Sequence, residues 1–84
     1  MKTNSKELDT EKTRIGNYIK SKLRESGQTI KSVVRKMNEI HTDREEHYQT
    51  TSNQINNATF PFWKAMRFAE AMGYEIKWEK IEGK

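Results

Sequence analysis

Residues 29–38 read TIKSVVRKMN and carry a clear helical pattern. Thr29 is a favoured N-cap residue, because its hydroxyl can accept a hydrogen bond from a free N–H group of the first helical turn. The apolar residues that follow share one face at helical spacing, and they are Ile30, Val33, Val34 and Met37. We therefore expect a short helix that begins after Thr29, buries this face and ends near Asn38.

A second apolar stripe precedes this helix. Its members are Ile15, Tyr18, Ile19 and Leu23. Asp9 or Thr10 is a suitable N-cap for it, and Gly27 is a suitable residue to end it. We expect a helix from about residue 10, preceded by a flexible arm over residues 1–9. Gly16 lies in the middle of this helix, where glycine costs about 1 kcal/mol relative to alanine.

The polar segment 39–46 separates this pair of helices from a third, which we expect to run to about Asn56. A capping box can open such a helix, because two side chains three residues apart satisfy two free N–H groups. The two candidates are Thr42 with Glu45 and Asp43 with Glu46. Thr51 and Ile55 form the expected inner face, and Tyr48 is a further candidate for it.

Pro61 suits the first position of a fourth helix, where its missing N–H costs nothing. The apolar residues at helical spacing are Phe62, Ala65, Met66, Ala69 and Met72. Gly73 is a natural C-terminal end for this helix. The expected helical domain therefore spans residues 10–73.

The period changes after Gly73, because Tyr74, Ile76 and Trp78 alternate with charged residues. This alternation predicts one short β-strand over residues 74–82. No second strand is evident in the sequence, and a lone strand leaves its backbone N–H and C=O groups unpaired. We therefore expect the strand to pair with that of a second copy, with Tyr74, Ile76 and Trp78 in the interface of a homodimer.

Composition excludes several classes of protein. Eighty-four residues form one domain, and the hydrophobic share is only 32%. There is no cysteine for disulfides or thiolate metal sites, and no apolar run is long enough for a membrane span. The two histidines, His41 and His47, lack the spacing of a helical metal-ligand pair. We find no catalytic motif, and we expect neither enzyme activity nor a metal, a cofactor or a small-molecule effector.

The formal net charge is +4 and the isoelectric point is about 9.4. This basic balance favours a polyanion, such as nucleic acid, as a partner.

Three segments of the chain resemble the lambda-repressor-like, or Cro-like, helix-turn-helix family of small phage and mobile-element regulators. Residues 29–38 resemble the second helix of that family. Residues 52–60, SNQINNATF, resemble the end of its recognition helix, and residues 70–76, EAMGYEI, resemble the helix end and tail of small phage members. The resemblance covers about residues 10–80 and implies an all-α, four-helix DNA-binding domain.

The chain departs from the family pattern at several positions. The connector between the second and third helices is longer than the usual three or four residues. Ile30, Val34, Thr51 and Asn57-Ala58 stand where the family commonly has Gln, Ala, Leu and Arg-Gly.

The resemblance makes the third helix the recognition helix, which would read bases in the major groove. Asn and Gln side chains match the N6 and N7 edge of adenine, and Ser and Thr add less selective contacts. The candidate base-reading residues are Tyr48, Gln49, Thr50, Ser52, Asn53 and Asn56. The candidate phosphate-binding residues are Lys31, Arg35, Lys36, Arg44, His47, Lys64 and Arg67, which would fix the register and carry the salt dependence.

These observations predict a dimeric, sequence-specific regulator of transcription that binds double-stranded DNA, acts as a repressor, and is cytoplasmic and nucleoid-associated. A second hypothesis is a protein-binding module, such as a phage-encoded inhibitor of a host defence nuclease built on the same fold. A third is an assembly protein whose aromatic residues only form homo-oligomers. Steep salt dependence and preference for one DNA sequence would favour the first.

Overall fold

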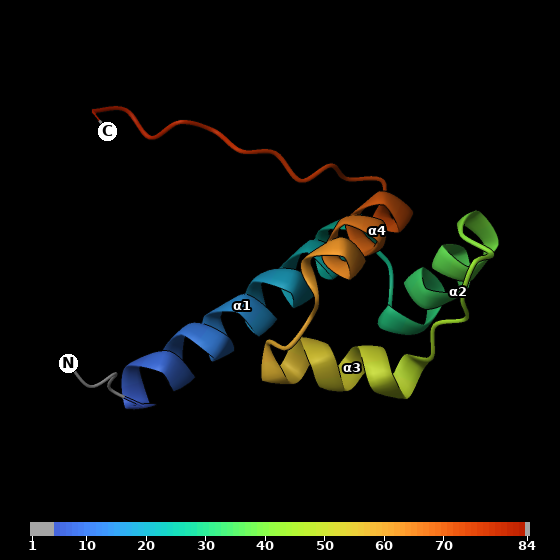
Figure 1. Cartoon of the computed structure of the whole chain (residues 1–84), viewed down its shortest axis with the longest axis horizontal. Helices are drawn as coiled ribbons and strands as arrows, with labels where there is room; N and C mark the ends of the chain where they lie inside the picture. The colour runs from blue at the N-terminus through green and yellow to red at the C-terminus, as the bar shows by residue number, and fades with distance from the viewer. Residues whose placement is uncertain (1–4, 84) are drawn as a thin grey trace.

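The computed structural model describes residues 5–83, which contain four α-helices and no β-strand (Figure 1). The helices are α1 (Ser5–Ser26), α2 (Ile30–Ile40), α3 (Tyr48–Asn57) and α4 (Phe62–Met72). Figure 1 shows α3 below α2 and α4, and the N-terminal half of α1 projecting beyond the other helices. The expected all-α class with four helices is confirmed.

One apolar core joins all four helices. Its buried members are Leu23 from α1, Val33 and Met37 from α2, Ile55 from α3, and Phe68 and Ala71 from α4. The ring of Phe60, in the turn before α4, meets the Phe68 ring edge-on with the centroids 5.3 Å apart. The inner faces expected for α2 and α3 are confirmed, because Val34 and Thr51 are buried as well.

The first helix begins earlier than expected. α1 already includes Ser5, so residues 5–9 of the expected flexible arm are helical, and residues 1–4 of that arm lie outside the described part of the chain. Thr10 is therefore not an N-cap. Its hydroxyl donates to the Lys6 carbonyl oxygen at 3.0 Å, one helical turn earlier.

The connector between α2 and α3 spans residues 41–47, and neither candidate capping box forms in it. α2 continues to Ile40, two residues beyond the expected end. The N-cap of α3 is His47, whose side chain makes no capping hydrogen bond. Asp43 and Glu46 cannot cap α3, because side chains of α4 hold their carboxylates.

The fourth helix presents only part of the expected face to the core, because Ala69 is buried and Met72 packs against the core as expected. Pro61 is its N-cap residue and not its first helical residue. Phe62 and Met66, expected inside, are exposed, whereas Lys64 and Phe68 are buried. The reason is that an ion pair at Lys64, described below, occupies the inner position.

The expected strand is absent: residues 74–83 contain no β-strand, and the correction has a simple physical cause. A strand needs a neighbour for its backbone groups, and residues 5–83 offer none. Trp78 is 88% exposed, and its ring centroid lies 6.4 Å from that of Phe62 at the start of α4. The segment therefore returns along α4 as extended chain.

α3 ends at a left-handed residue that is not glycine. Ala58 has φ 55°, and the Thr59 N–H donates to the Gln54 carbonyl oxygen at 2.9 Å. The family pattern has glycine at this place, where a Cβ atom costs roughly 1–2 kcal/mol.

Gly16 lies where α1 packs closely against α3. It is buried, and a Cβ atom built on it would lie 3.1 Å from the Ile55 carbonyl oxygen. The two backbones therefore approach each other more closely than a larger residue permits.

Replacing Gly16 by Val should lower the free energy of unfolding by about 1–3 kcal/mol, because its branched side chain forces α1 and α3 apart. The measurement is urea denaturation followed by circular dichroism. Asn17→Val is the matched control, since Asn17 is the exposed neighbour on the same helix, and it should change the value by less than about 0.5 kcal/mol. Equal effects of both variants would contradict the role given to Gly16.

Thr51 has 0% exposure, and its Oγ1 makes no hydrogen bond within the described residues. Thr51→Val keeps the shape and removes the unpaired hydroxyl, so it should raise the free energy of unfolding by about 1 kcal/mol. Thr50→Val, at the exposed neighbour, should leave it nearly unchanged. A lower melting temperature for Thr51→Val would show that the hydroxyl has a partner in solution.

Candidate nucleic-acid interface

The start of α2 is fixed by a pair of reciprocal hydrogen bonds. The Ser32 N–H donates to Thr29 Oγ1 at 3.1 Å, and the Thr29 N–H donates to Ser32 Oγ at 3.1 Å. Sequence analysis identified the Thr29 cap but not its partner. The capping box orients the first turn of α2, where the Lys31 ammonium lies 5.7 Å from the centroid of the Tyr48 ring. This contact joins the start of α2 to the start of α3.

The outer side of α3 is polar and uncharged. Thr51 and Ile55 face the core, and α3 contains no Lys, Arg, Asp or Glu. Of the candidate base-reading residues, Tyr48, Gln49, Thr50, Asn53 and Asn56 are exposed and Ser52 is half-buried. Asn57, which sequence analysis did not include, is exposed too. The structure thus brings the candidates together on one helix with side-chain amides facing outward.

Two of these amides bond to each other. Gln49 Nε2 donates to Asn53 Oδ1 at 3.3 Å, across one turn of α3. Gln54, by contrast, is turned to the protein: its Oε1 accepts a hydrogen bond from Lys64 Nζ of α4 at 2.7 Å. Gln49 and Asn53 therefore form a pair on the exposed side of α3, whereas Gln54 binds Lys64 of α4.

A row of three side-chain pairs joins the connector to α4. Its members are the contact of His41 Nε2 with Glu70 Oε1 at 2.8 Å, the ion pair of Asp43 with Arg67 at 3.0 Å, and the ion pair of Glu46 Oε1 with Lys64 Nζ at 2.9 Å. The connector and α4 run in opposite directions along this row. Sequence analysis missed it, although Lys64, Arg67 and Glu70 recur every three residues of α4 and so share one side of the helix.

The Lys64–Glu46 pair is buried at the end of this row. Lys64 is 2% exposed and the Glu46 side chain 5%. Arg44 Nε lies 2.8 Å from the other oxygen, Glu46 Oε2. The Asn38 side chain of α2 bonds the Glu46 backbone twice, donating to its carbonyl oxygen at 3.0 Å and accepting from its N–H at 2.7 Å. Glu46, which precedes the N-cap of α3, is therefore bound by side chains of both α2 and α4.

Two arginines of this region stack on the exposed ring of Trp63. The guanidinium carbons of Arg44 and Arg67 lie 4.7 and 5.5 Å from the centroid of its ring. Arg67 also donates to both oxygens of Asp43, at 3.0 and 3.2 Å. This hydrogen bonding to Arg67 lowers the pKa of the Asp43 carboxyl below its ordinary value. Both arginines are thus engaged within the protein.

The candidate phosphate-binding residues consequently form two groups. Those held by carboxylates of the connector are Arg44, Lys64 and Arg67. Those exposed and without an ion pair in the described part of the chain are Lys31, Arg35, Lys36 and His47. Lys64 and Arg67 join α4 to the connector, and Arg44 is exposed but pairs with Glu46 within the connector. Only the second group is exposed without a carboxylate partner in residues 5–83.

The described residues include no group of three or more His, Cys, Asp or Glu side chains able to hold a metal ion. None of the helices in residues 5–83 combines the length and apolar character needed to cross a membrane.

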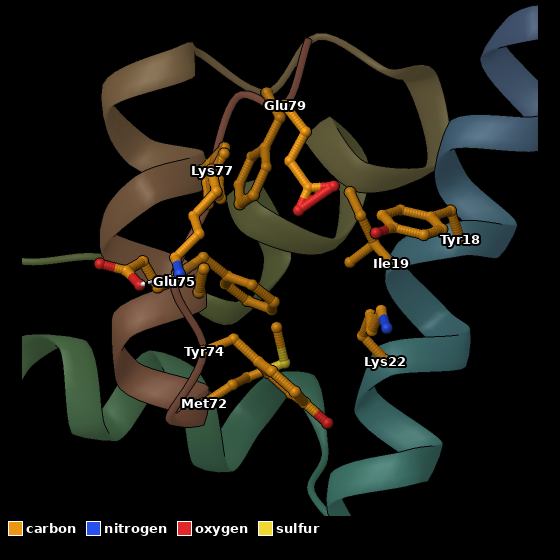
Figure 2. Close-up of a pocket in the computed structure, with 13 residues that line it drawn as sticks. Tyr18, Ile19, Lys22, Met72, Tyr74, Glu75, Lys77 and Glu79 are labelled. Atoms are coloured by element: carbon orange, nitrogen blue, oxygen red, sulfur yellow. Dashed lines mark ion pairs between the residues drawn. The ribbon is translucent and has the colours of Figure 1, made fainter. Parts of the chain in front are cut away.

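A groove of about 510 Å³ lies between α1, α4 and the C-terminal segment (Figure 2). Tyr18 and Lys22 line it from α1, and Tyr74 lines it from the C-terminal segment. The Lys22 ammonium lies 5.6 Å from the centroids of both tyrosine rings. Phe68 and Met72 contribute apolar surface, and none of the lining residues belongs to α3. The groove is therefore a second surface, separate from the polar side of α3.

Comparison with known proteins finds no matching family, no matching curated protein and no matching solved structure. The likeness to the helix-turn-helix family stays a prediction based on the residues quoted above.

Removing one partner of the buried pair should be costly. Lys64→Met leaves Oε1 of the buried Glu46 carboxylate without its cation, while Arg44 still lies at Oε2, and we expect the free energy of unfolding to fall by about 3–5 kcal/mol. Glu46→Gln should also destabilise the protein, and the double variant should lose less than the sum of the two single losses. Urea denaturation of the unaltered protein, the two single variants and the double variant measures the interaction free energy between Lys64 and Glu46.

Arg14→Ala is the control for this cycle. It removes an exposed ion pair in which Arg14 lies 3.4 Å from Glu11. The free energy of unfolding should fall by at most about 1 kcal/mol. Additive losses for the Lys64 and Glu46 variants would mean that the two side chains do not stabilise each other.

Proposed function

We propose that this protein is a sequence-specific regulator of transcription that binds double-stranded DNA and reads the major groove with α3. The observation that carries the proposal is the exposed, uncharged side of α3, which is rich in side-chain amides and lies beside cations of α2 that pair with no carboxylate among the described residues. The absence of acidic residues from α3 matters because a carboxylate there would repel the phosphates that flank the groove.

The residue types on α3 suit base recognition. A planar amide carries one donor group and one acceptor, which match N7 and N6 of adenine at about 1–3 kcal/mol of discrimination per good bidentate pair. The candidates with exposed amides are Gln49, Asn53, Asn56 and Asn57. Tyr48, Thr50 and Ser52 add contacts at the edge of this surface.

The electrostatic part of binding falls to α2. Lys31, Arg35 and Lys36 are exposed, and neutralising phosphates with such groups releases counterions and makes affinity depend steeply on salt. His47, at the N-cap of α3, is a further phosphate contact. We do not expect phosphate contacts from the three cations whose partners are carboxylates of the connector, which are Arg44, Lys64 and Arg67.

In this proposal α2, the connector and α3 form a helix-turn-helix unit with a long turn, and the protein works as a homodimer in the cytoplasm at the nucleoid. Two copies would place their α3 helices in half-sites about 34 Å apart. Tyr74, Ile76 and Trp78 are exposed apolar residues and remain the proposed dimer contacts, although they form no strand. Covering a promoter in this way represses transcription.

The groove favours a second candidate function, in which the protein binds another protein. Tyr18 and Tyr74 flank it and are exposed, as is Trp78 further along the C-terminal segment. Exposed apolar surface of this kind commonly marks an interaction site. Such a function predicts binding that neither prefers a DNA sequence nor falls log-linearly with salt.

The DNA-binding proposal is tested by selection from randomised duplexes, followed by fluorescence anisotropy on the selected and on random DNA between about 50 and 200 mM salt. Asn53→Ala should relax the preference at one position by about tenfold. Arg35→Ala should weaken binding to both duplexes and reduce the slope of log affinity against log salt by about 1.

Arg67→Ala is the matched control for Arg35→Ala, because it removes the same charge from a site already paired with Asp43. It should leave the salt slope close to that of the unaltered protein. If Arg35→Ala and Arg67→Ala change the slope equally, the division of the cations is wrong. If selection recovers no preferred sequence, the proposed function itself is wrong.

A further inference from the structure

The middle of α1 crosses the last turn of α3. A Cβ atom at Gly16 would lie 3.1 Å from the Ile55 carbonyl oxygen, so the backbones of the two helices are in contact there. Figure 1 shows the end of α3 beside the middle of α1, whose first half continues past α3 along the same lower edge of the view. Residues on the Gly16 side of α1 therefore lie next to the end of the polar surface of α3.

Two lysines of α1 lie on this side. Lys12 and Lys20 are four residues before and four residues after Gly16, so each is about one turn, or about 6 Å along the helix axis, from the crossing. Both are half-buried. Lysines in this setting lay their alkyl chains along the protein and keep their ammonium groups in water. The two charges therefore lie at the surface on either side of the crossing.

These two lysines are not neutralised by a carboxylate. Neither of them forms an ion pair within residues 5–83. The acidic residue on the same side of α1 is Asp9, which lies seven residues, about 10 Å, before Gly16. α3 contributes no acidic residue either. Lys12 and Lys20 are therefore available to an anion beside the end of α3.

Different cations flank the two ends of α3. At its start, the Lys31 ammonium of α2 lies 5.7 Å from the centroid of the Tyr48 ring, whereas the lysines of α1 lie at its end. A helix of ten residues is about 15 Å long, so the two sets of cations are too far apart to bind the same phosphate. The major groove is only about 12 Å wide, so a helix inside it brings the segments packed at both of its ends close to the DNA backbone.

We propose that Lys12 and Lys20 form a second phosphate-binding site, which contacts the DNA backbone beside the end of α3 as the cations of α2 do beside its start. The inference rests on the proposed function and adds to it the residues that anchor the far end of α3. Phosphate contacts fix the orientation of a protein on the duplex and carry no base information. With cations at both ends, α3 is held along its whole length in the groove.

The experiment measures binding of the double variant Lys12→Gln/Lys20→Gln to selected and to random duplexes between about 50 and 200 mM salt. Each phosphate contact contributes about 0.9 to the slope of log affinity against log salt, so the slope should fall by about 2. Affinity should fall by a similar factor on both duplexes, so that the preference for the selected sequence is kept.

Arg14→Gln/Lys22→Gln is the matched control. It removes the same charge from the same helix, at residues that lie on other sides of α1 and already pair with glutamates of α1. Its slope should stay within about 0.5 of that of the unaltered protein. Lys12→Arg/Lys20→Arg keeps both charges and should keep the slope as well.

Three results would overturn the inference while leaving sequence-specific binding intact. They are a slope that falls by less than about 1 in the glutamine variant, an equal fall in the control, and a fall of about 2 in the arginine variant. Selection of no sequence by the unaltered protein would instead overturn the proposed function. Melting temperatures check that each variant is folded. If glutamine lowers the melting temperature, Lys12→Met/Lys20→Met removes the same charges with side chains of similar apolar length and takes its place.

Discussion

The buried ion pair between Lys64 and Glu46 is the contact on which the placement of α3 depends. Glu46 leads into α3, and Lys64 belongs to α4 and also holds Gln54 within α3. Asn38 fixes the backbone of Glu46 from α2. A pair of this kind adds little net stability, because both charges must leave water, but it makes one geometry far better than its neighbours. The polar side of α3 is therefore presented at an orientation set by a charge inside the protein.

Sequence reasoning succeeded where the signal was local. The cap at Thr29 and the inward positions of Val33, Met37 and Ile55 follow from spacing along one helix, and all four are as expected. It failed for Lys64, because lysine is almost never fully buried unless it is paired, and its partner lies in another segment. The strand at residues 74–82 failed for a related reason, since alternation describes a strand but does not supply the neighbour that it needs.

In the candidate site too, the sequence alone does not tell which charged residues are paired. The seven proposed phosphate contacts look alike in the sequence, and only the fold decides which of them meet a carboxylate. Arg44 and Arg67 lie against Trp63 and acidic residues of the connector, whereas Lys31 and Arg35 meet no carboxylate within residues 5–83. A net charge of +4 therefore does not give the charge that a polyanion would encounter at α3.

The row of side-chain pairs between the connector and α4 also bears on how the protein unfolds locally. Because three side-chain pairs hold the connector along α4, and Lys64 reaches on into α3, these segments should unfold as one cooperative unit. Most residues in the first turns of α1 and in the segment 74–83 are exposed. The native ensemble should therefore include states in which the start of α1 and residues 74–83 are frayed while α3 keeps its place against the connector and α4.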